Sequence, residues 1–225
     1  MSLRFKSYFV NALTLSRIPL IFCFMIGAVI AQLRGGPAGG PDPWPAFAAG
    51  MFMFLAGISD LFDGKLARRW KVVSTFGKMA DPLMDKVYFI VSFPTLLWMI
   101  GAQGGSTTHT VVMLAFTVLY ILRDQWVTFL RAIASSYKAD VSAMWLGKVR
   151  TALSFPAAGY IYAYLSFHGL LPVVFTDDAT CAAVDHGLLV SVYCVEGFLI
   201  ALNLYSCLSY TKVYWPYMVR AIGAK

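Results

Sequence analysis

The sequence predicts an all-α integral membrane protein with six transmembrane helices and both termini in the cytoplasm. Of its 225 residues, 59% are hydrophobic and only 13% are charged, and the mean hydropathy is +0.69. A water-soluble domain of this length carries far more charge. The apolar residues also come in blocks long enough to cross a bilayer as helices. We expect a single membrane domain over residues 1–225.

Six apolar stretches each come close to the ~20 residues that a helix needs to cross the hydrocarbon core. Segments 35–45, 101–109 and 168–181 are predicted loops, the first two from their Gly and Pro content. The first stretch follows Arg4 and Lys6 as a signal peptide would, but no small-residue cleavage site comes after it, so we expect a retained helix. The predicted spans are residues 14–32, 45–67, 83–101, 110–135, 147–167 and 188–211.

The distribution of basic residues sets the expected orientation. Most of the 18 Lys and Arg residues gather at the two termini, in 68–86 and in 131–150, and only Arg34 borders one of the three loops. The positive-inside bias places these basic regions in the cytoplasm. The net charge of +7 then reflects membrane flanks that favour anionic lipids. No basic run interleaved with aromatic residues indicates nucleic-acid binding. The basic composition and the lack of a transit peptide favour a multi-pass protein of the cell inner (cytoplasmic) membrane.

Four aspartates flank the connection between the second and third predicted spans. Asp60 and Asp63 lie three residues apart at the end of one span, and Asp81 and Asp85 lie four apart at the start of the next. On helices, both spacings put the pair on one face. A loop of about ten residues between the pairs would make the two helices antiparallel neighbours. We therefore expect all four carboxylates to converge near the cytoplasmic interface.

Ionised carboxylates near lipid are costly, by about 2.5–3.5 kcal/mol each at mid-membrane, so positive charge must offset them. Two hard divalent ions with oxygen ligands would use four carboxylates well, and such ions also bridge phosphates. The alternative is that the aspartates form ion pairs along a solvated helix edge. The basic residues available for such pairs are Lys65, Arg68, Arg69, Lys78 and Lys86. Four acids in this register at a membrane edge favour a functional site.

Small residues accompany the aspartates. Gly64 and Ala67 lie on the same helical stripe as Asp60, and Gly77 lies one turn before the second pair. They would let a ligand or another helix approach the backbone, although helix packing alone would also explain them. Arg68 would supply a fork of donors to a pyrophosphate.

The pattern D-x2-D-G-x2-A-R-x8-G-x3-D-x3-D, from Asp60 to Asp85, resembles the full signature of the CDP-alcohol phosphatidyltransferases. The chain length, the six spans and the segment N-A-L-T-L-S-R-I-P (11–19) are similar to the same family. The resemblance implies an enzyme, a homodimer, that transfers a phosphatidyl group from CDP-diacylglycerol to an alcohol and releases CMP. It implies two Mg²⁺ or Mn²⁺ ions held by Asp60, Asp63, Asp81 and Asp85, with Asp85 as the general base. The residues that it implies for CDP-diacylglycerol binding are Asn11, Thr14, Asp60, Gly64, Ala67, Arg68, Ser74 and Gly77.

Basic residues in the later spans bear on the acceptor. Arg123 lies inside the fourth span, Arg131 follows two turns later on a similar face, and Lys148 and Arg150 open the fifth span. A buried arginine in an apolar helix usually faces a polar cavity. Arg123 could instead pair with Asp124 or a site carboxylate, and the others could be ordinary cytoplasmic flanking charges.

The segments R-D-Q-W-V-T-F-L-R (123–131) and W-L-G-K-V-R-T (145–151) resemble the phosphatidylglycerophosphate synthase branch of that family. Asp124 stands where glutamate is usual. The resemblance implies sn-glycerol 3-phosphate as the acceptor and phosphatidylglycerol phosphate as the product. It also implies Arg123, Arg131 and Lys148 as the residues that bind the acceptor phosphate.

Two alternatives stay open from the sequence. The same chemistry could use another acceptor, namely inositol phosphate, serine or phosphatidylglycerol. A protein of a different class, an ion-coupled membrane transporter, would also carry intramembrane carboxylates, but spread across the membrane depth. Here the four aspartates cluster at one interface, and Glu196 is the only acid deep in another span.

Overall fold

The computed structural model describes residues 3–36, 40–72, 74–139, 141 and 145–223, and the regular structure in these ranges is helical. The elements are α1 (Leu3–Leu15), α2 (Arg17–Arg34), α3 (Pro43–Arg69), α4 (Thr75–Ala102), α5 (Thr107–Ser136), α6 (Trp145–Phe167), the 3-10 helix η2 (His168–Leu170), α7 (Leu171–Val174) and α8 (Asp178–Ala221).

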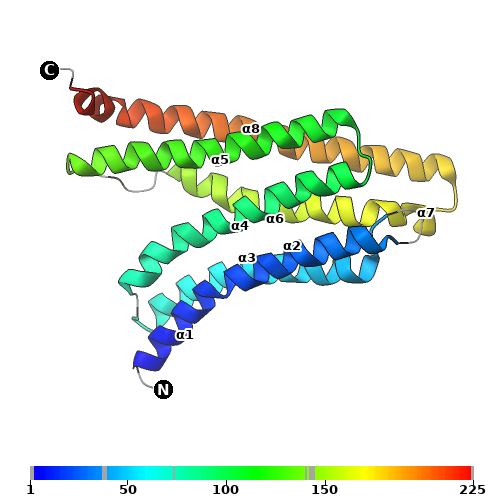
Figure 1. The fold of residues 1–225 in the computed structure, drawn as a ribbon, viewed down its shortest axis with the longest axis horizontal. Helices are drawn as coiled ribbons and strands as arrows, with labels where there is room; N and C mark the ends of the chain where they lie inside the picture. The colour runs from blue at the N-terminus through cyan, green and yellow to red at the C-terminus, as the bar shows by residue number, and fades with distance from the viewer. Residues whose placement is uncertain (1–2, 37–39, 73, 140, 142–144, 224–225) are drawn as a thin grey trace.

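Six helical segments in the described part of the chain are long and apolar enough to cross a membrane, which confirms the predicted number. The first combines α1 with α2, and the fifth runs from α6 through α7. Figure 1 shows the long helices lying side by side along the long axis of the molecule. They extend past the predicted spans, because helix formation continues into the polar flanks where hydropathy alone would end the segment.

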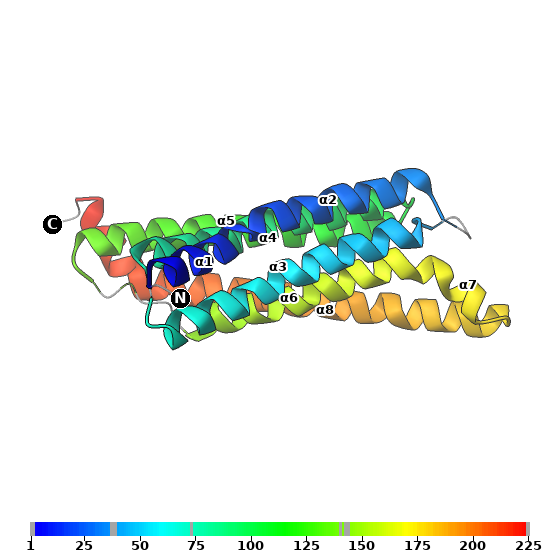
Figure 2. The ribbon, with the colours of Figure 1, turned by 90° about the horizontal axis from the view of Figure 1, so that it is seen from below.

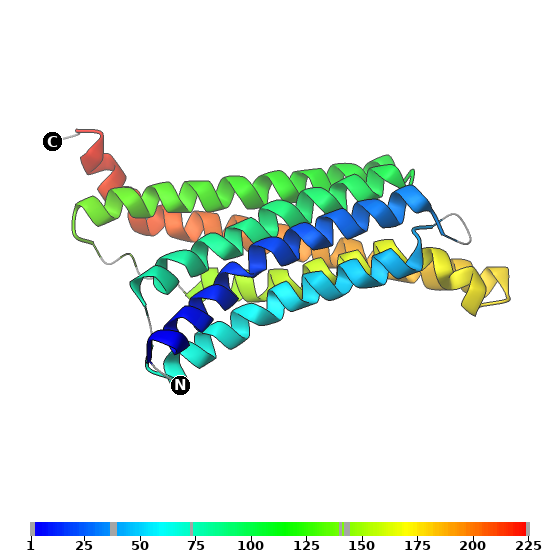
Figure 3. The ribbon, with the colours of Figure 1, turned by 60° about the horizontal axis from the view of Figure 1, so that its bottom comes forward.

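Successive spans run in opposite directions, so that the two ends of the chain lie at the same end of the bundle (Figures 1 and 2). The same end holds the last turns of α3, the first turns of α4, the last turns of α5 and the start of α6. In Figure 3, α1 lies beside the end of α3 and the beginning of α4. The segments that carry the four aspartates and the basic residues of the later spans are therefore grouped at one end.

A break between α1 and α2 divides the first span, which the sequence predicts as one helix from residue 14. Pro19 explains it, because a proline ring clashes with the carbonyl four residues earlier, here that of Leu15. The interruption is local, because the backbone of Ser16 stays helical and its amide donates to the Ala12 carbonyl at 2.9 Å. The Ser16 hydroxyl donates to the carbonyl of Leu13 at 2.7 Å. Arg17 is the first residue of the new helix.

The connection between α3 and α4 is shorter than the expected loop of about ten residues, since α3 ends at Arg69 and α4 begins at Thr75. Ser74 is the N-cap of α4, and its hydroxyl accepts a hydrogen bond from the Gly77 amide at 2.9 Å. Such a cap satisfies one of the amides left free at a helix start. The helix therefore begins well before Asp81.

The other predicted loops also differ in extent. The loop 35–45 ends at Asp42, which caps α3 by accepting from the Trp44 amide, and its residues 37–39 lie outside the described part. The predicted loop 101–109 is shorter in the structure, where residues 103–106 connect α4 and α5. The loop 168–181 contains η2 and α7, and α8 begins within it at Asp178.

An aromatic cluster joins α4 to its neighbours. The ring centroid of Phe93 lies 4.7 Å from that of Phe116 and 4.9 Å from that of Tyr120, both on α5. Phe89, one turn earlier, lies 4.8 Å from Phe155 on α6. Phe93 is completely buried. Interiors packed at this density tolerate little loss of volume, so the cluster holds α4 at a defined position against α5 and α6.

We predict that Phe93→Ala lowers the free energy of unfolding by roughly 3 kcal/mol or more, because it leaves a cavity at the centre of this cluster. In a chain of this size, the apparent melting temperature in detergent should fall by roughly 6 °C or more. Phe198→Ala on α8 is the control, since the Phe198 ring is 56% exposed. Equal losses in the two variants would contradict this account of the core.

Candidate active site

The aspartates at the α3–α4 end are grouped around one arginine. Arg17 Nη2 lies 2.8 Å from Asp60 Oδ1 and also contacts Asp63 Oδ2, and Arg17 Nη1 lies 3.4 Å from Asp85 Oδ1. Arg17 and Asp63 are buried, whereas Asp60 and Asp85 are partly exposed. Asp81 belongs to the same group through a cavity that it shares with Asp60 and Asp63.

This smaller cavity, with a volume of about 290 Å³, is formed by α1, the end of α3 and the start of α4. Asn11 accepts a hydrogen bond from the Ser74 hydroxyl at 2.9 Å, which ties α1 to the cap of α4. A methyl group at Gly77 would lie 3.2 Å from that hydroxyl. All eight residues expected to bind CDP-diacylglycerol line this cavity: Asn11, Thr14, Asp60, Gly64, Ala67, Arg68, Ser74 and Gly77.

Two of these residues have roles that the signature does not reveal. The Thr14 hydroxyl lies 2.8 Å from Asp63 Oδ2 and 3.2 Å from the Val10 carbonyl, so that it helps to orient a carboxylate from inside the cavity wall. Arg68 is exposed, and its Nε donates to the carbonyl of Gly64 at 3.1 Å. The remainder of the Arg68 guanidinium can donate to a ligand.

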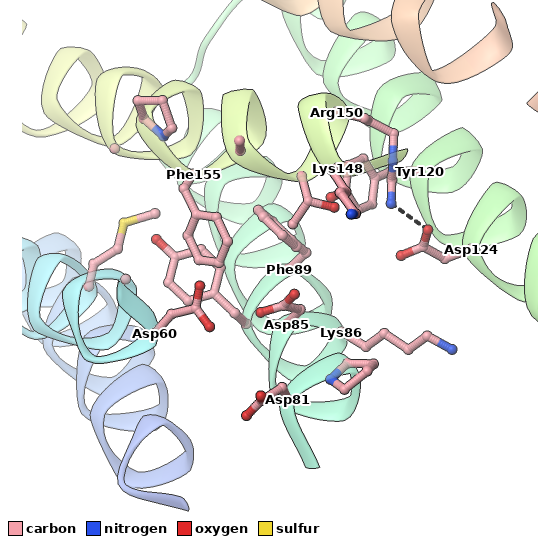
Figure 4. Close-up of a pocket in the computed structure, with 18 of the residues that line it drawn as sticks. Asp60, Asp81, Asp85, Lys86, Phe89, Tyr120, Asp124, Lys148, Arg150 and Phe155 are labelled. Atoms are coloured by element: carbon pink, nitrogen blue, oxygen red, sulfur yellow. Dashed lines mark hydrogen bonds and ion pairs between the residues drawn. The ribbon is translucent and has the colours of Figure 1, made fainter. Parts of the chain in front are cut away.

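A larger cavity, of about 1020 Å³, lies between α3, α4, α5 and α6. One part of it is polar, with Asp60, Asp81 and Asp85 on one side and the basic residues Lys148 and Arg150 of α6 on the other (Figure 4). Basic residues of α5 line this part too. Its other part is lined by apolar side chains, including Phe47 and Phe54 on the first half of α3. A ligand with a charged head and an apolar tail would match both parts.

The four aspartates are divided between the two cavities. Asp63 lines only the smaller one, Asp85 lines only the larger one, and Asp60 and Asp81 line both. The two cavities therefore meet at Asp60 and Asp81. A group bound at this junction would face carboxylates on both sides.

The basic side of the larger cavity is an ion-pair network. Asp124 Oδ1 accepts from Arg123 Nη1 at 3.0 Å and from Arg150 Nη2 at 2.5 Å. Arg123 also donates to the Ser206 hydroxyl, and Arg150 donates to Asn203 Oδ1 at 3.3 Å. Two guanidinium groups share one carboxylate, so that the network keeps a net positive charge. Such a site suits an anion with several acceptor oxygens, such as a phosphate.

Aromatic rings hold these two guanidinium groups in place. Arg123 lies over the ring of Tyr210 with its central carbon 4.9 Å from the ring centroid, and Arg150 lies over Tyr120 at 4.2 Å. A methyl group at Gly147 would lie only 2.6 Å from the Tyr210 hydroxyl. Gly147 therefore allows α8 to bring Tyr210 under Arg123.

The three residues expected at the acceptor phosphate differ in their surroundings. Arg123 is buried and pairs with Asp124, which was the alternative interpretation of this residue, but it also lines the cavity. Arg131 lines the cavity too, and its Nε and Nη2 donate to the Val141 carbonyl at 3.0 and 2.5 Å. Lys148 lines the cavity and is exposed.

The described contacts do not show the aspartates in ion pairs with the basic residues near them in sequence, which was the alternative interpretation. The ion pairs described for Asp60, Asp63 and Asp85 are with Arg17. Lys86 donates instead to the Thr128 hydroxyl at 2.9 Å. The side chain of Lys78 lies outside the described part of the structure.

Two residues at the centre of the site are absent from the sequence-based set. In the sequence, Arg17 stands out only as part of the family-like segment 11–19, and Arg150 only as one of the basic residues that open the fifth span, with flanking charge as the alternative. Both are buried in the bundle. The reasoning that singled out Arg123, that an arginine in an apolar helix faces a polar cavity, applies equally to Arg17.

The chemistry of the aspartates fits hard divalent cations. Carboxylate oxygens are the ligands that Mg²⁺ and similar ions prefer, and three of these carboxylates already contact one shared cation, the Arg17 guanidinium. In this arrangement, no three His, Cys, Asp or Glu side chains of the described part are placed to hold a metal ion. A metal that bound the carboxylate oxygens now in contact with Arg17 would compete with this guanidinium.

Comparisons with known proteins agree with this chemistry. The sequence model of the CDP-alcohol phosphatidyltransferase family matches residues 8–184. Curated proteins from Escherichia coli (strain K12) and Shigella sonnei (strain Ss046), both named CDP-diacylglycerol–glycerol-3-phosphate 3-phosphatidyltransferase, are 29% identical over 121 residues. This match covers 54% of the chain and 63% of each relative. Since the family model spans most of the sequence, including all four aspartates, the chain belongs to the CDP-alcohol phosphatidyltransferase family.

Proposed function

We propose that this protein transfers the phosphatidyl group of CDP-diacylglycerol to sn-glycerol 3-phosphate, giving phosphatidylglycerol phosphate and CMP. One observation carries the proposal: the two cavities meet at Asp60 and Asp81, so that a donor bound across this junction would lie next to the basic part of the larger cavity. The names of the curated relatives, which are acceptor-specific, support the choice of glycerol 3-phosphate.

The donor would lie across the junction. Its cytidine and pyrophosphate would occupy the smaller cavity, where Asn11 and Gly77 allow close approach and Arg68 donates to phosphate oxygens. Its diacylglycerol part would extend into the larger cavity along apolar residues of α3 such as Phe47 and Phe54. The phosphorus that bears the diacylglycerol would then lie near Asp60 and Asp81.

The acceptor would enter the basic part of the larger cavity. Arg123, Arg131 and Lys148 are proposed to bind its phosphate, and we add Arg150, which shares Asp124 with Arg123. An anchored phosphate would leave the glycerol hydroxyl groups facing the aspartates on the opposite wall (Figure 4). This placement converts a bimolecular encounter into a positioned reaction.

Asp85 is proposed as the general base, since it is the one aspartate of the four that lines the larger cavity, where the acceptor would bind, without also lining the smaller one. It would accept the proton of the attacking hydroxyl as the new P–O bond forms and the bond to CMP breaks. The family generally depends on divalent metals. When bound to Asp60, Asp63, Asp81 and Asp85, two Mg²⁺ or Mn²⁺ ions would neutralise the pyrophosphate and the departing CMP.

The arrangement of the chain ends and of the basic residues bears on the location of the enzyme in the membrane. The grouping of both chain ends with the aspartates, together with the basic flanks, supports an inner-membrane protein whose termini and active site face the cytoplasm. We propose a single domain over residues 1–225 and a homodimer, as the family resemblance implies. An ion-coupled transporter is disfavoured by family membership, and inositol phosphate, serine or phosphatidylglycerol stay as alternative acceptors.

The acceptor can be tested directly with purified protein in mixed micelles. With CDP-diacylglycerol and Mg²⁺ or Mn²⁺, we expect radiolabelled glycerol 3-phosphate to enter the lipid fraction with stoichiometric release of CMP. Inositol phosphate, serine and phosphatidylglycerol should release no CMP above background. CMP release with one of these acceptors but not with glycerol 3-phosphate would overturn the choice of acceptor while leaving phosphatidyl transfer intact.

Asp85→Asn should lower kcat by about 100-fold or more, the usual contribution of a general base. CDP-diacylglycerol binding, measured by isothermal calorimetry, and thermal stability should stay close to those of the parent. Asp185→Asn is the control, because Asp185 lies in the first turns of α8, at the end of the bundle opposite to the chain termini (Figure 1). Its contact among the described residues is the Tyr164 hydroxyl, from which it accepts at 3.3 Å. Parent-like turnover by Asp85→Asn would exclude the proposed base.

Lys148→Gln and Arg150→Gln should each raise KM for glycerol 3-phosphate, by roughly 10-fold for the loss of one charge-assisted hydrogen bond. KM for CDP-diacylglycerol should change little, because neither residue lines the smaller cavity. Lys148 is exposed, so its replacement should leave the fold intact. Lys212→Gln, at an exposed position of α8, is the control. An unchanged acceptor KM in both variants would remove these residues from the acceptor site.

A further inference from the structure

Arg17 occupies an unusual position for a cation in a metal-dependent site. Its side chain is buried, and it contacts three of the four aspartates proposed to hold metal ions, namely Asp60, Asp63 and Asp85. Its Nε has no hydrogen-bond partner among the described residues. The guanidinium is therefore held in place by these carboxylates.

A divalent ion and this guanidinium would compete for the same oxygens. Mg²⁺ binds carboxylate oxygens at about 2.0–2.1 Å, and like charges at such short range repel strongly in a site partly shielded from water. Asp60, Asp63 and Asp85 each direct one oxygen to Arg17. One guanidinium offsets only part of the charge of three or four carboxylates, so that a divalent ion would still be attracted.

The local backbone places Arg17 at the interruption between two helices. It is the first residue of α2, next to Ser16, where Pro19 interrupts the helix. On the other side, Thr14 on α1 donates to Asp63, the same carboxylate that Arg17 contacts. Arg17 and Thr14 thus hold one carboxylate from the two sides of the interruption between α1 and α2.

We propose that Arg17 is a counter-ion of these aspartates that competes with divalent metal for their oxygens, and that it thereby lowers the metal affinity of the enzyme. This inference rests on the proposed function only in assigning the metals to the aspartates. Arg17 would stabilise the empty site, where uncompensated carboxylates would otherwise oppose folding. The metal would bind at the expense of the contacts that Arg17 makes.

The test measures Mn²⁺ binding by electron paramagnetic resonance on purified protein in detergent, without substrates. Arg17→Gln should bind Mn²⁺ at least about tenfold more tightly than the parent, because both the competitor and its repulsive charge are gone. Arg17→Lys should fall between the two, since lysine keeps the charge but presents a single nitrogen. Arg150→Gln also removes a buried guanidinium from the site region, and should leave Mn²⁺ affinity within about threefold of the parent.

A second measurement covers the stability of the empty site. Without metal, Arg17→Gln should melt at a lower temperature than the parent, and Mn²⁺ should raise its melting temperature by more than it raises that of the parent. If Arg17→Gln folds only when Mn²⁺ is present, the inference is also supported. If it folds under neither condition, the Mn²⁺ affinity of Arg17→Lys decides, and a value equal to that of the parent counts against the inference.

Unchanged or weaker Mn²⁺ binding by folded Arg17→Gln would overturn the inference. Weaker binding would indicate that Arg17 positions the carboxylates for the metal. Such a result would leave the proposed function standing, because the parent would still bind Mn²⁺ and the transfer assay would be unaffected. Failure of the parent to bind Mn²⁺ would overturn the metal assignment together with this inference, and the transfer assay would then report separately on the reaction.

Discussion

Negative charge gathered at the edge of an apolar bundle requires positive charge within contact distance, and much of this structure follows from how that requirement is met. The aspartates of α3 and α4 meet Arg17, which reaches them because α2 begins at a break imposed by Pro19. Because Ser74 caps α4, that helix begins at Thr75, before Asp81. Asn11 on α1 accepts a hydrogen bond from the Ser74 hydroxyl and so joins α1 to this helix start. Local backbone signals thus place each charge.

The larger cavity carries opposite charges on facing walls. Asp60, Asp81 and Asp85 lie on one side, and the network that joins Arg123 and Arg150 through Asp124 lies on the other. Neither wall is neutralised by the other. An acceptor that carries a phosphate at one end and a hydroxyl at the other would be aligned by this field before any reaction. Serine or phosphatidylglycerol would interact with it differently, since their charges are arranged in other ways.

The sequence was sufficient for features that depend on local spacing. The number of spans follows from apolar length, and the grouping of the aspartates was expected from helical spacing. The family resemblance, and not periodicity, added Asn11 and Ser74, which line the same cavity as Gly77. The partners of charged groups could not be predicted in this way. Arg17 and Asp63 are separated by 46 residues, and Arg123 and Ser206 by 83. Their contacts depend on how helices pack, which periodicity alone does not specify.

The helix break and the short α3–α4 connection illustrate a second limit. Pro19 and Ser74 are visible in the sequence, but hydropathy averages over them, so that the first span was expected to be continuous and the connection longer than residues 70–74. The capping and steric preferences of single residues decided both cases. They also decided where the aspartates lie relative to their helix ends.

The close approach of Tyr210 to Gly147 has a consequence for how this sequence can evolve. The Tyr210 hydroxyl fills the space that any side chain at position 147 would need, while the Tyr210 ring lies against Arg123. Position 147 is therefore coupled to α8, although it performs no chemistry. In a scan of all substitutions, Gly147 should tolerate replacement as poorly as a charged residue of the site. A larger residue there would become acceptable only together with a smaller one at position 210.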